Sequence, residues 1–343
     1  MHSNLSLAKL VACYPARREV FMFKELAAAF LVLSSALMSA QVQHTRGMAH
    51  STDIDIAYET LGRQGSALPV FAINGGPGLT HAYMVQNDLW ERAARKRLVV
   101  FYDQRGTGAS KPKGTMAVSQ SIQAQVADLD AVRQALKLEK IALVGDSYGG
   151  LVAMAYAAAH PEHVTKLVLS DSPGPSWKSI VHLLPDVFPD VGEQNEQEMK
   201  KLGGGNSGAQ PGDQQNEITR RANQNDAAAR AGLRNHFKMI FYSPEKRDAY
   251  MSGMGDLGYE PSVAEAVSKA TEGLDLSSKL TDFKFPTLVI NGRYDMNVAP
   301  LTAWRLAHDI PGAKVVFFEK SGHLPSYEEP EKYLQVLEEF LGR

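Results

Sequence analysis

The sequence has 343 residues, 44% of them hydrophobic, so the chain can bury a substantial core as one enlarged domain or as a domain with an insertion. The 36 basic residues nearly balance the 38 acidic ones, for a net charge of -2, so no long-range field favours nucleic acid or an anionic membrane as a partner. The single cysteine, Cys13, excludes an intrachain disulfide framework and a thiolate metal cage. We therefore expect a protein held together by packing, with a small or medium-sized molecule as substrate.

The N-terminal segment, residues 1–40, has the pattern of an export signal. Lys24 precedes an apolar run over residues 26–37, and small residues offer cleavage points. Met22 opens this pattern more naturally than Met1, which favours an upstream extension before it. An uncleaved membrane anchor or a buried helix is the alternative, although the run is shorter than the ~20 residues that a bilayer span needs. We expect a periplasmic or secreted protein with no stable membrane association after removal of the leader.

After the leader, short strand-like runs alternate with helical patterns. The later runs are continuously apolar, as a strand buried on both faces of a parallel sheet requires, so helices must cover both faces. The alternation predicts an α/β fold with an open, mostly parallel, doubly wound sheet. The expected strands are 54–59, 69–73, 98–102, 141–144, 166–169, 286–290 and 314–318, and the expected helices are 121–136, 148–159, 301–308 and 331–341.

Between residues 176 and 280 this alternation stops, and the chain becomes polar and helix-like. The change predicts a helical cap inserted between two parts of the core, residues 41–175 and 281–343. Such a cap suits the carboxyl edge of the sheet, where ligands bind in open α/β folds. Its expected helices are 217–240, 244–251 and 261–271.

A G-x-S-x-G motif spans Gly145 to Gly149, directly after an expected strand and directly before an apolar helix. A sharp strand-to-helix turn holds a serine oxygen clear of the backbone, where a base can reach it, so Ser147 is the expected nucleophile. The first helical amides also point toward the site, and the Tyr148 N–H is an expected oxyanion donor. The alternative is a glycine-rich turn with an incidental serine.

Two further strand ends supply an acid and a base. Asp295 follows the expected strand 286–290 and His323 follows 314–318, so both emerge at the same edge as Ser147. Taken singly, Asp295 is equally typical of a turn cap, and His323 is more typical of an ordinary loop histidine. Taken together, the order Ser, Asp, His predicts a catalytic triad, with His323 as general base and Asp295 as the carboxylate that orients it.

The loop Asn74-Gly-Gly-Pro-Gly78 follows another expected strand, and its glycines let backbone amides face a developing alkoxide. A phosphate-binding loop is the alternative, but no Walker lysine or dinucleotide spacing follows. Together with Asp103-Gln-Arg-Gly-Thr-Gly108 and Gly145-Asp-Ser-Tyr-Gly-Gly150, this loop resembles the proline iminopeptidase family of α/β-hydrolases. The resemblance covers roughly residues 50–175 and 281–343.

The resemblance implies an α/β-hydrolase fold that needs no metal or organic cofactor and releases an N-terminal residue, often proline, from short peptides. It matches Gly76 to an oxyanion donor that acts beside Tyr148. Asp103 and Arg105 are expected to act as scaffold for the loop beside the site.

The sequence departs from the family in two places. Asn74 replaces the family's histidine, although Asn can still brace the loop through hydrogen bonds. The family also uses cap glutamates to hold the substrate's charged amine, and the cap does not align here. For each candidate a solvated helix face is the commoner interpretation, since exposed glutamates are frequent. The candidates are Glu193, Glu196, Glu198, Glu217 and Glu245.

The leading expectation is therefore an exported aminopeptidase of the proline iminopeptidase type. A carboxylic-ester or lactone hydrolase with the same triad is the alternative, because only the leaving group differs. A non-catalytic ligand receptor and a lyase that borrows the triad also remain open. Composition predicts no oligomeric state.

Overall fold

The structure is a computed structural model that describes residues 42–112, 118–176, 183–201 and 214–342. The chain divides into two compact units, residues 1–42 and 43–343, and the second contains the sheet with the helices around it. The expected leader lies outside the described residues, so export stays a prediction. No helix in the described part of the chain combines the length and apolar character that a membrane span requires.

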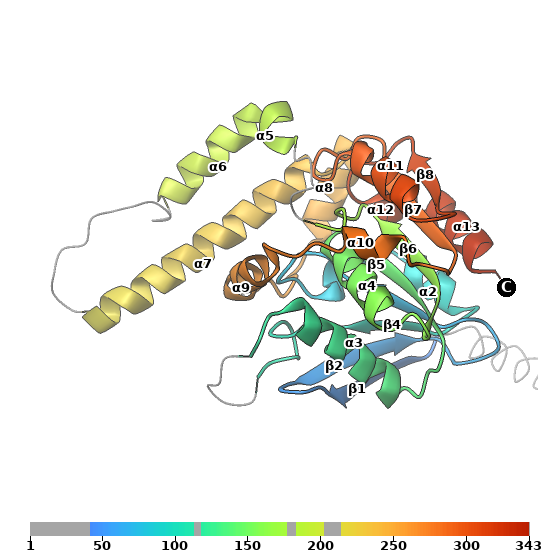
Figure 1. The fold of residues 1–343 in the computed structure, drawn as a ribbon. Coiled ribbons are helices and arrows are strands. Elements are labelled where there is room, and N and C mark those ends of the chain that lie inside the picture. Colours follow the sequence, from blue (N-terminus) through green and yellow to red (C-terminus); the bar gives the residue numbers. More distant parts are fainter. Residues whose placement is uncertain (1–41, 113–117, 177–182, 202–213, 343) are drawn as a thin grey trace, which may run out of the picture. The chain divides into compact units, whose positions relative to one another are not determined.

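Eight strands of the second unit form one sheet in the order β1-β2-β4-β3-β5-β6-β7-β8 (Figure 1). The pairs β1·β2 and β2·β4 are antiparallel, whereas all pairs from β4 to β8 are parallel, which confirms the expected mostly parallel sheet. The strands are β1 His44–His50, β2 Asp55–Leu61, β3 Val70–Ile73, β4 Val99–Tyr102, β5 Ile141–Asp146, β6 Val164–Ser170, β7 Thr287–Gly292 and β8 Lys314–Phe318.

All seven expected strands are present, but β1 was not expected. Its sequence carries no apolar run, and most of its side chains are exposed. The strand forms because its backbone pairs with β2 along its whole length, from His44 opposite Leu61 to His50 opposite Asp55. A polar edge strand of this kind is defined by its partner rather than by its own sequence.

Helices cover both faces of the sheet (Figure 1). In β4, Phe101 packs edge-on against Trp90 of α2, while Val100 and Tyr102 point to the opposite face and join the core beneath α3 and α4. Strand side chains alternate between faces, so this one strand contributes to both layers. The core helices are α2 Leu89–Ala94, α3 Ile122–Ala135, α4 Tyr148–Ala159, α11 Pro300–Asp309, α12 Pro325–Glu328 and α13 Pro330–Leu341, with a 3₁₀ turn, η1, at His81–Val85.

The segment between β6 and β7 is helical, and α7 packs against α6, α8 and α9. Ser243 begins α8 by accepting a hydrogen bond from the Lys246 N–H, and proline opens both α8 and α9, where it needs no amide partner. The three helices expected here are present. The inserted helices are α5 Leu184–Val187, α6 Pro189–Lys201, α7 Gln214–Met239, α8 Pro244–Gly253, α9 Pro261–Thr271 and α10 Ser277–Leu280.

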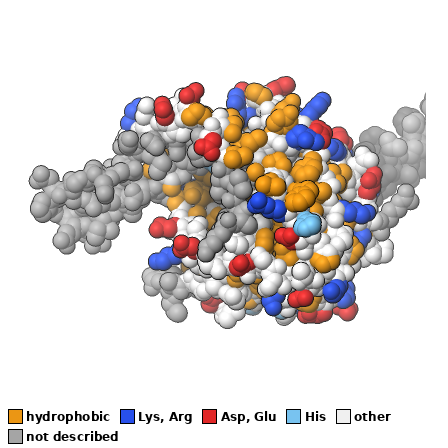
Figure 2. Space-filling view, turned by 45° about the horizontal axis from the view of Figure 1, so that its top comes forward, with side chains coloured by type: hydrophobic (Ala, Val, Ile, Leu, Met, Phe, Trp, Pro, Cys, Tyr) orange, Lys and Arg blue, Asp and Glu red, His pale blue; other side chains and the backbone are white. Residues whose placement is uncertain are grey.

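Acidic and basic side chains are interspersed on the face shown in Figure 2, with hydrophobic side chains between them. Surface charges of mixed sign largely cancel beyond about 10 Å at moderate ionic strength. This face therefore presents no extended field of one sign to a charged partner.

A buried ion pair fixes the loop that follows β4. Arg105 donates from Nε to one oxygen of Asp128 in α3 and from a terminal nitrogen to the other, both at 2.7 Å. Both side chains are about 1% exposed. Arg105 therefore serves as scaffold, as expected, and ties the loop beside the site to a core helix.

Removing the charge of Asp128 should destabilise the fold. Asp128→Asn leaves the buried guanidinium of Arg105 with Asp53, 3.1 Å away and partly exposed, as its remaining carboxylate partner. The expected cost in unfolding free energy is about 3 kcal/mol, the lower end of the range for breaking a buried ion pair. Chemical denaturation followed by circular dichroism measures this loss. The matched control is Glu319→Gln, which breaks the exposed pair between Glu319 and Arg293 and should leave the midpoint nearly unchanged. Equal effects of the two variants would contradict the prediction.

Candidate active site

Ser147 lies on a strained turn between β5 and α4. Its backbone angles, φ 50° and ψ −126°, fall outside the regions that non-glycine residues normally occupy. Its N–H donates to the carbonyl of Ser170 in the neighbouring strand, at 2.9 Å. A Cβ at Gly149 would come within 2.2 Å of the Ile73 carbonyl oxygen, so the helix can approach the sheet this closely only with glycine there. The turn expected from the motif is therefore present, and it exposes the serine oxygen.

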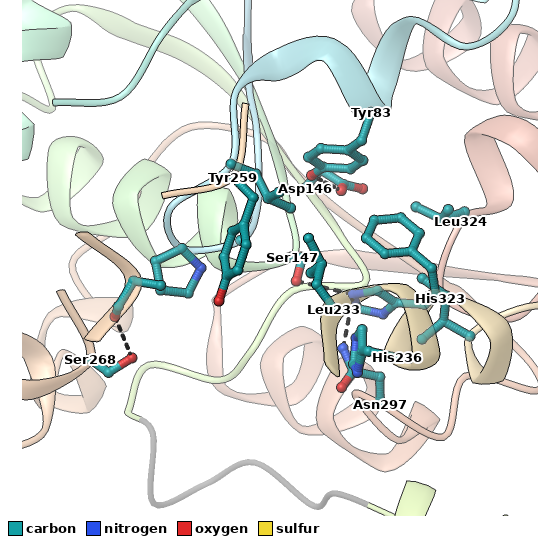
Figure 3. Close-up of a pocket in the computed structure, with 16 residues that line it drawn as sticks. Tyr83, Asp146, Ser147, Leu233, His236, Tyr259, Ser268, Asn297, His323 and Leu324 are labelled. Atoms are coloured by element: carbon teal, nitrogen blue, oxygen red, sulfur yellow. Dashed lines mark hydrogen bonds between the residues drawn. The ribbon is translucent and has the colours of Figure 1, made fainter. Parts of the chain in front are cut away.

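His323 connects Ser147 to Asp295. Its Nε2 lies 3.0 Å from the Ser147 Oγ (Figure 3). Its Nδ1 lies 2.7 Å from Oδ2 of Asp295. Asp295 is fully buried, and its other oxygen accepts hydrogen bonds from the N–H groups of Asn297 and Val298, both at 2.9 Å. The three side chains that the sequence places at one edge of the sheet are thus brought together.

The surroundings of His323 set its charge. Burial by itself would lower the pKa of His323, but the charge and hydrogen bond of Asp295, helped by the charge of Asp146, raise that pKa above its ordinary value. Since Asp295 accepts at Nδ1, the neutral imidazole carries its proton on Nδ1 and presents Nε2 as an acceptor. Nε2 then faces both the Ser147 hydroxyl and the side-chain amide of Asn297, which is 3.2 Å away.

Side chains that the sequence analysis did not single out brace the glycine-rich loop. The Gly75 N–H donates to the Tyr83 hydroxyl, and that hydroxyl donates to Oδ2 of Asp146, each at 2.5 Å. Asn74 donates from its amide to the carbonyls of Gly75 and Leu79, so it braces the loop as expected. This chain of contacts links the loop to the residue before Ser147.

Burial raises the pKa of Asp146 to about 6, although the charge of His323 and the hydroxyl of Tyr83 act in the opposite direction. The only signal for Asp146 in the sequence is its place as the second residue of the G-x-S-x-G motif, whose side chain no rule assigns. Tyr83 follows no recognisable pattern.

The two residues expected as oxyanion donors lie beside Ser147. Gly76 lines the cavity that contains Ser147 and His323. Tyr148 is the first residue of α4, and its side chain turns into the core, where its hydroxyl donates to Gln125 at 2.7 Å. A Cβ at Gly75 would come within 2.7 Å of the Ser147 Cβ, which shows how closely the loop packs on the serine.

The cavity above Ser147 measures about 270 Å³ and is walled by both the core and the inserted helices (Figure 3). Its inserted wall is mainly apolar and comes from the end of α7 and from α9. Asp146 is the one carboxylic acid among its described lining residues. The lining consists of Gly76, Pro77, Leu79, Tyr83, Asp146, Ser147, Leu233, His236, Phe237, Ile240, Tyr259, Ala264, Ser268, Asn297, His323 and Leu324.

Of the glutamates expected to bind the substrate amine, those whose side chains the structure describes do not line this cavity. Glu193 and Glu245 are exposed on α6 and α8. Glu198 accepts a hydrogen bond from the Asn235 amide at 2.9 Å. The side chains of Glu196 and Glu217 lie outside the described residues.

Comparisons with known proteins agree with this geometry. A family model described as the alpha/beta hydrolase fold matches residues 69–330. The proline iminopeptidase of Lactobacillus delbrueckii subsp. bulgaricus is 27% identical over 292 residues, covering 80% of this chain and 89% of the relative. The proline iminopeptidase of Heyndrickxia coagulans is 28% identical over 313 residues, covering 87% of this chain and 99% of the relative.

Among solved structures, a thermophilic esterase from Thermogutta terrifontis matches with a TM-score of 0.62 at 23% identity, over 87% of this chain and 98% of the esterase. At this identity the likeness concerns the fold alone. The relatives confirm the resemblance to proline iminopeptidases that the motifs indicated. With the family model matched over most of its length, the chain belongs to the α/β-hydrolase fold family.

Proposed function

We propose that this protein is a serine hydrolase that works through an acyl-enzyme, with Ser147 as nucleophile, His323 as general base and Asp295 as orienting carboxylate. The observation that carries the proposal is the position of His323, hydrogen-bonded to Asp295 on one nitrogen and to Ser147 on the other. The strained turn at Ser147 supports it further, because such strain persists where the surrounding structure holds a reactive side chain in place.

The reaction would begin when the Ser147 Oγ attacks the substrate carbonyl carbon and its proton passes to Nε2 of His323. Asp295 stabilises the imidazolium through Nδ1. His323 then gives this proton to the leaving group, the bond to the carbonyl carbon breaks, and an acyl-serine remains. A water molecule, deprotonated by His323 in the same way, releases the acyl group as an acid.

The oxyanion of each tetrahedral intermediate would be bound by the backbone N–H groups of Gly76 and Tyr148. Their support is position: Gly76 lines the cavity, and Tyr148 follows Ser147 at the start of α4. Tyr83 and Asn74 keep the glycine-rich loop in place and so would serve this function indirectly.

For the substrate, we propose the N-terminal residue of short peptides. The support comes from the loop and serine motifs and from the named activity of the curated relatives. The cavity is small and mainly apolar on its inserted wall, which suits a compact acyl group such as a prolyl residue.

A second candidate, a carboxylic-ester or lactone hydrolase, is favoured by one specific observation. Asp146 is the sole carboxylic acid in the described lining of the cavity, and it already accepts a hydrogen bond from Tyr83. An aminopeptidase has to bind a charged amine, whereas an esterase does not.

Replacing the nucleophile tests the reaction class. Ser147→Ala should abolish labelling by a fluorophosphonate probe and lower kcat/KM by about 10⁴-fold or more, because the acyl-enzyme cannot form. The matched control is Ser268→Ala, in the same cavity, whose hydroxyl donates to the Ala264 carbonyl and has no part in the reaction. Wild-type protein that the probe does not label would favour a ligand receptor instead.

The pH dependence of kcat/KM should reflect His323. The base must be neutral, and the pKa of His323 is raised above 6.5, so activity should fall as the pH decreases through a value above 6.5. Asp146→Asn removes a negative charge that contributes to this shift, and should move the acidic limb to lower pH. Steady-state kinetics on one substrate across pH 5 to 9 gives both curves. A limb that moves to higher pH in this variant would contradict the electrostatic account.

A substrate panel separates the two candidate functions. Purified protein is assayed with prolyl and alanyl arylamides, the corresponding N-acetylated arylamides, p-nitrophenyl esters and lactones. An aminopeptidase should prefer free aminoacyl arylamides over their N-acetylated counterparts, because only the former carry a charged amine. Hydrolysis of esters or lactones with intact arylamides would reject the aminopeptidase in favour of the second candidate.

A further inference from the structure

A second carboxyl group, that of Asp171, lies beside the pair formed by Asp295 and His323. Asp171 follows the last residue of β6 and has no exposed surface. Its Oδ1 accepts a hydrogen bond from the Gly292 N–H at 2.9 Å, and its Oδ2 accepts one from the Ser170 hydroxyl at 3.0 Å. The proposed mechanism leaves this buried group unused.

The carboxyl oxygens of Asp171 and Asp295 both lie close to the ring of His323. One oxygen of Asp171, one oxygen of Asp295 and one ring nitrogen of His323 all lie within 4.8 Å of one another. Two other titratable groups interact with Asp171: Asp146 at the end of β5 and the hydroxyl of Tyr333 in α13. The imidazole of His323 is therefore close to two carboxyl groups that follow separate strands. Only that of Asp295 is hydrogen-bonded to it.

The two carboxyl groups differ in how well their charged forms are stabilised. Asp295 accepts from the N–H groups of Asn297 and Val298 and from His323, whereas Asp171 accepts from one N–H and one hydroxyl. Carboxylates this close in a buried site cannot both be ionised without a large cost in free energy. Burial raises the pKa of Asp171 well above its ordinary value, and the charges of Asp295 and Asp146 raise it further. The hydrogen bonds therefore stabilise a charge on Asp295 better than one on Asp171, and burial favours the protonated form of Asp171.

Asp171 also has an unusual backbone. Its φ of 45° lies in the left-handed region, which few non-glycine residues adopt. If the residue at this position served only to accept a hydrogen bond from Gly292, an asparagine could do so, because asparagine tolerates this conformation equally well. Asp171 instead has a group that can ionise, with one oxygen within 4.8 Å of a ring nitrogen of His323.

We infer that Asp171 is a reserve acid for His323: it stays neutral while Asp295 holds the charge, and it can ionise and orient the imidazole when the charge of Asp295 is removed. The inference rests on the proposed triad. In that state Asp171 releases its proton to solvent, a rotation of its side chain shortens the distance to His323, and its carboxylate accepts the Nδ1 hydrogen. Asp171 is a positioning residue, because it acts only through His323.

The test is a double-mutant cycle with Asp295→Asn, Asp171→Asn and the variant that carries both. Removing the acid from an ordinary triad costs about 10⁴-fold in kcat. Asp295→Asn should lose clearly less than this, and its activity should rise with pH as Asp171 gives up its proton. Asp171→Asn should change the wild-type rate less than tenfold near pH 7. The double variant should show the full loss and no longer gain activity at alkaline pH.

Each outcome separates the inference from a structural role. If Asp171 only anchors Gly292, Asp171→Asn will have the same effect in both backgrounds, and Asp295→Asn will show the full loss without an alkaline rise; either result overturns the inference. Thermal unfolding of every variant identifies losses caused by misfolding. Should Asp171→Asn fail to fold, the size and pH dependence of the loss in Asp295→Asn still decide the question.

The same experiment distinguishes failure of the inference from failure of the proposed function. If the wild type is labelled at Ser147 by the fluorophosphonate and turns over substrate, the triad stands whatever the cycle shows. If the wild type is neither labelled nor active, the proposed function fails first.

Discussion

The hydrogen bond between Asp295 and His323 depends on a constraint that the whole fold supplies: parallel strands end at the same edge of the sheet. The ends of β5, β7 and β8 bring Ser147, Asp295 and His323 to that edge from positions up to 176 residues apart in the chain. A buried carboxylate is costly unless it is paired and hydrogen-bonded. Asp295, which is fully buried, meets both conditions through His323 and two backbone amides.

The inserted helices belong to the same arrangement, because they hold the loop that carries His323. The His323 N–H donates to the carbonyl of Ile240, just after α7, at 2.7 Å. Buried Glu328 accepts hydrogen bonds from the N–H groups of Tyr242 and Gly322, and so joins the two segments from the other side. Ile240 also lines the cavity. A shift of the inserted wall would therefore move both the boundary of the cavity and His323.

The sequence predicts those parts of the site that follow from strand ends and tight turns. Ser147 was recognisable from the G-x-S-x-G motif, and Asp295 and His323 from their places in loops after buried apolar runs, in the order Ser, Asp, His. Tyr83 was not, since its contact with Asp146 spans 63 residues and follows no periodicity. β1 was not predicted for a related reason. It is a strand because its backbone pairs with β2, and its own composition does not indicate one. Contacts between segments far apart in the chain could not be predicted where neither segment carries a local sequence pattern.

The question of peptide or ester substrates depends on charge close to the reacting atoms. In an aminoacyl substrate the amine is two bonds from the carbonyl carbon, so a group that binds it must lie within a few ångströms of Ser147. Glu193 and Glu245 are exposed and do not line the cavity, whereas Asp146 adjoins the serine and does. With a pKa near 6, Asp146 is largely ionised at neutral pH, and its charge would favour a cationic acyl group. The hydrogen bond from Tyr83 competes for that charge, so the balance between these two side chains governs how strongly the described cavity distinguishes an amine from a neutral group.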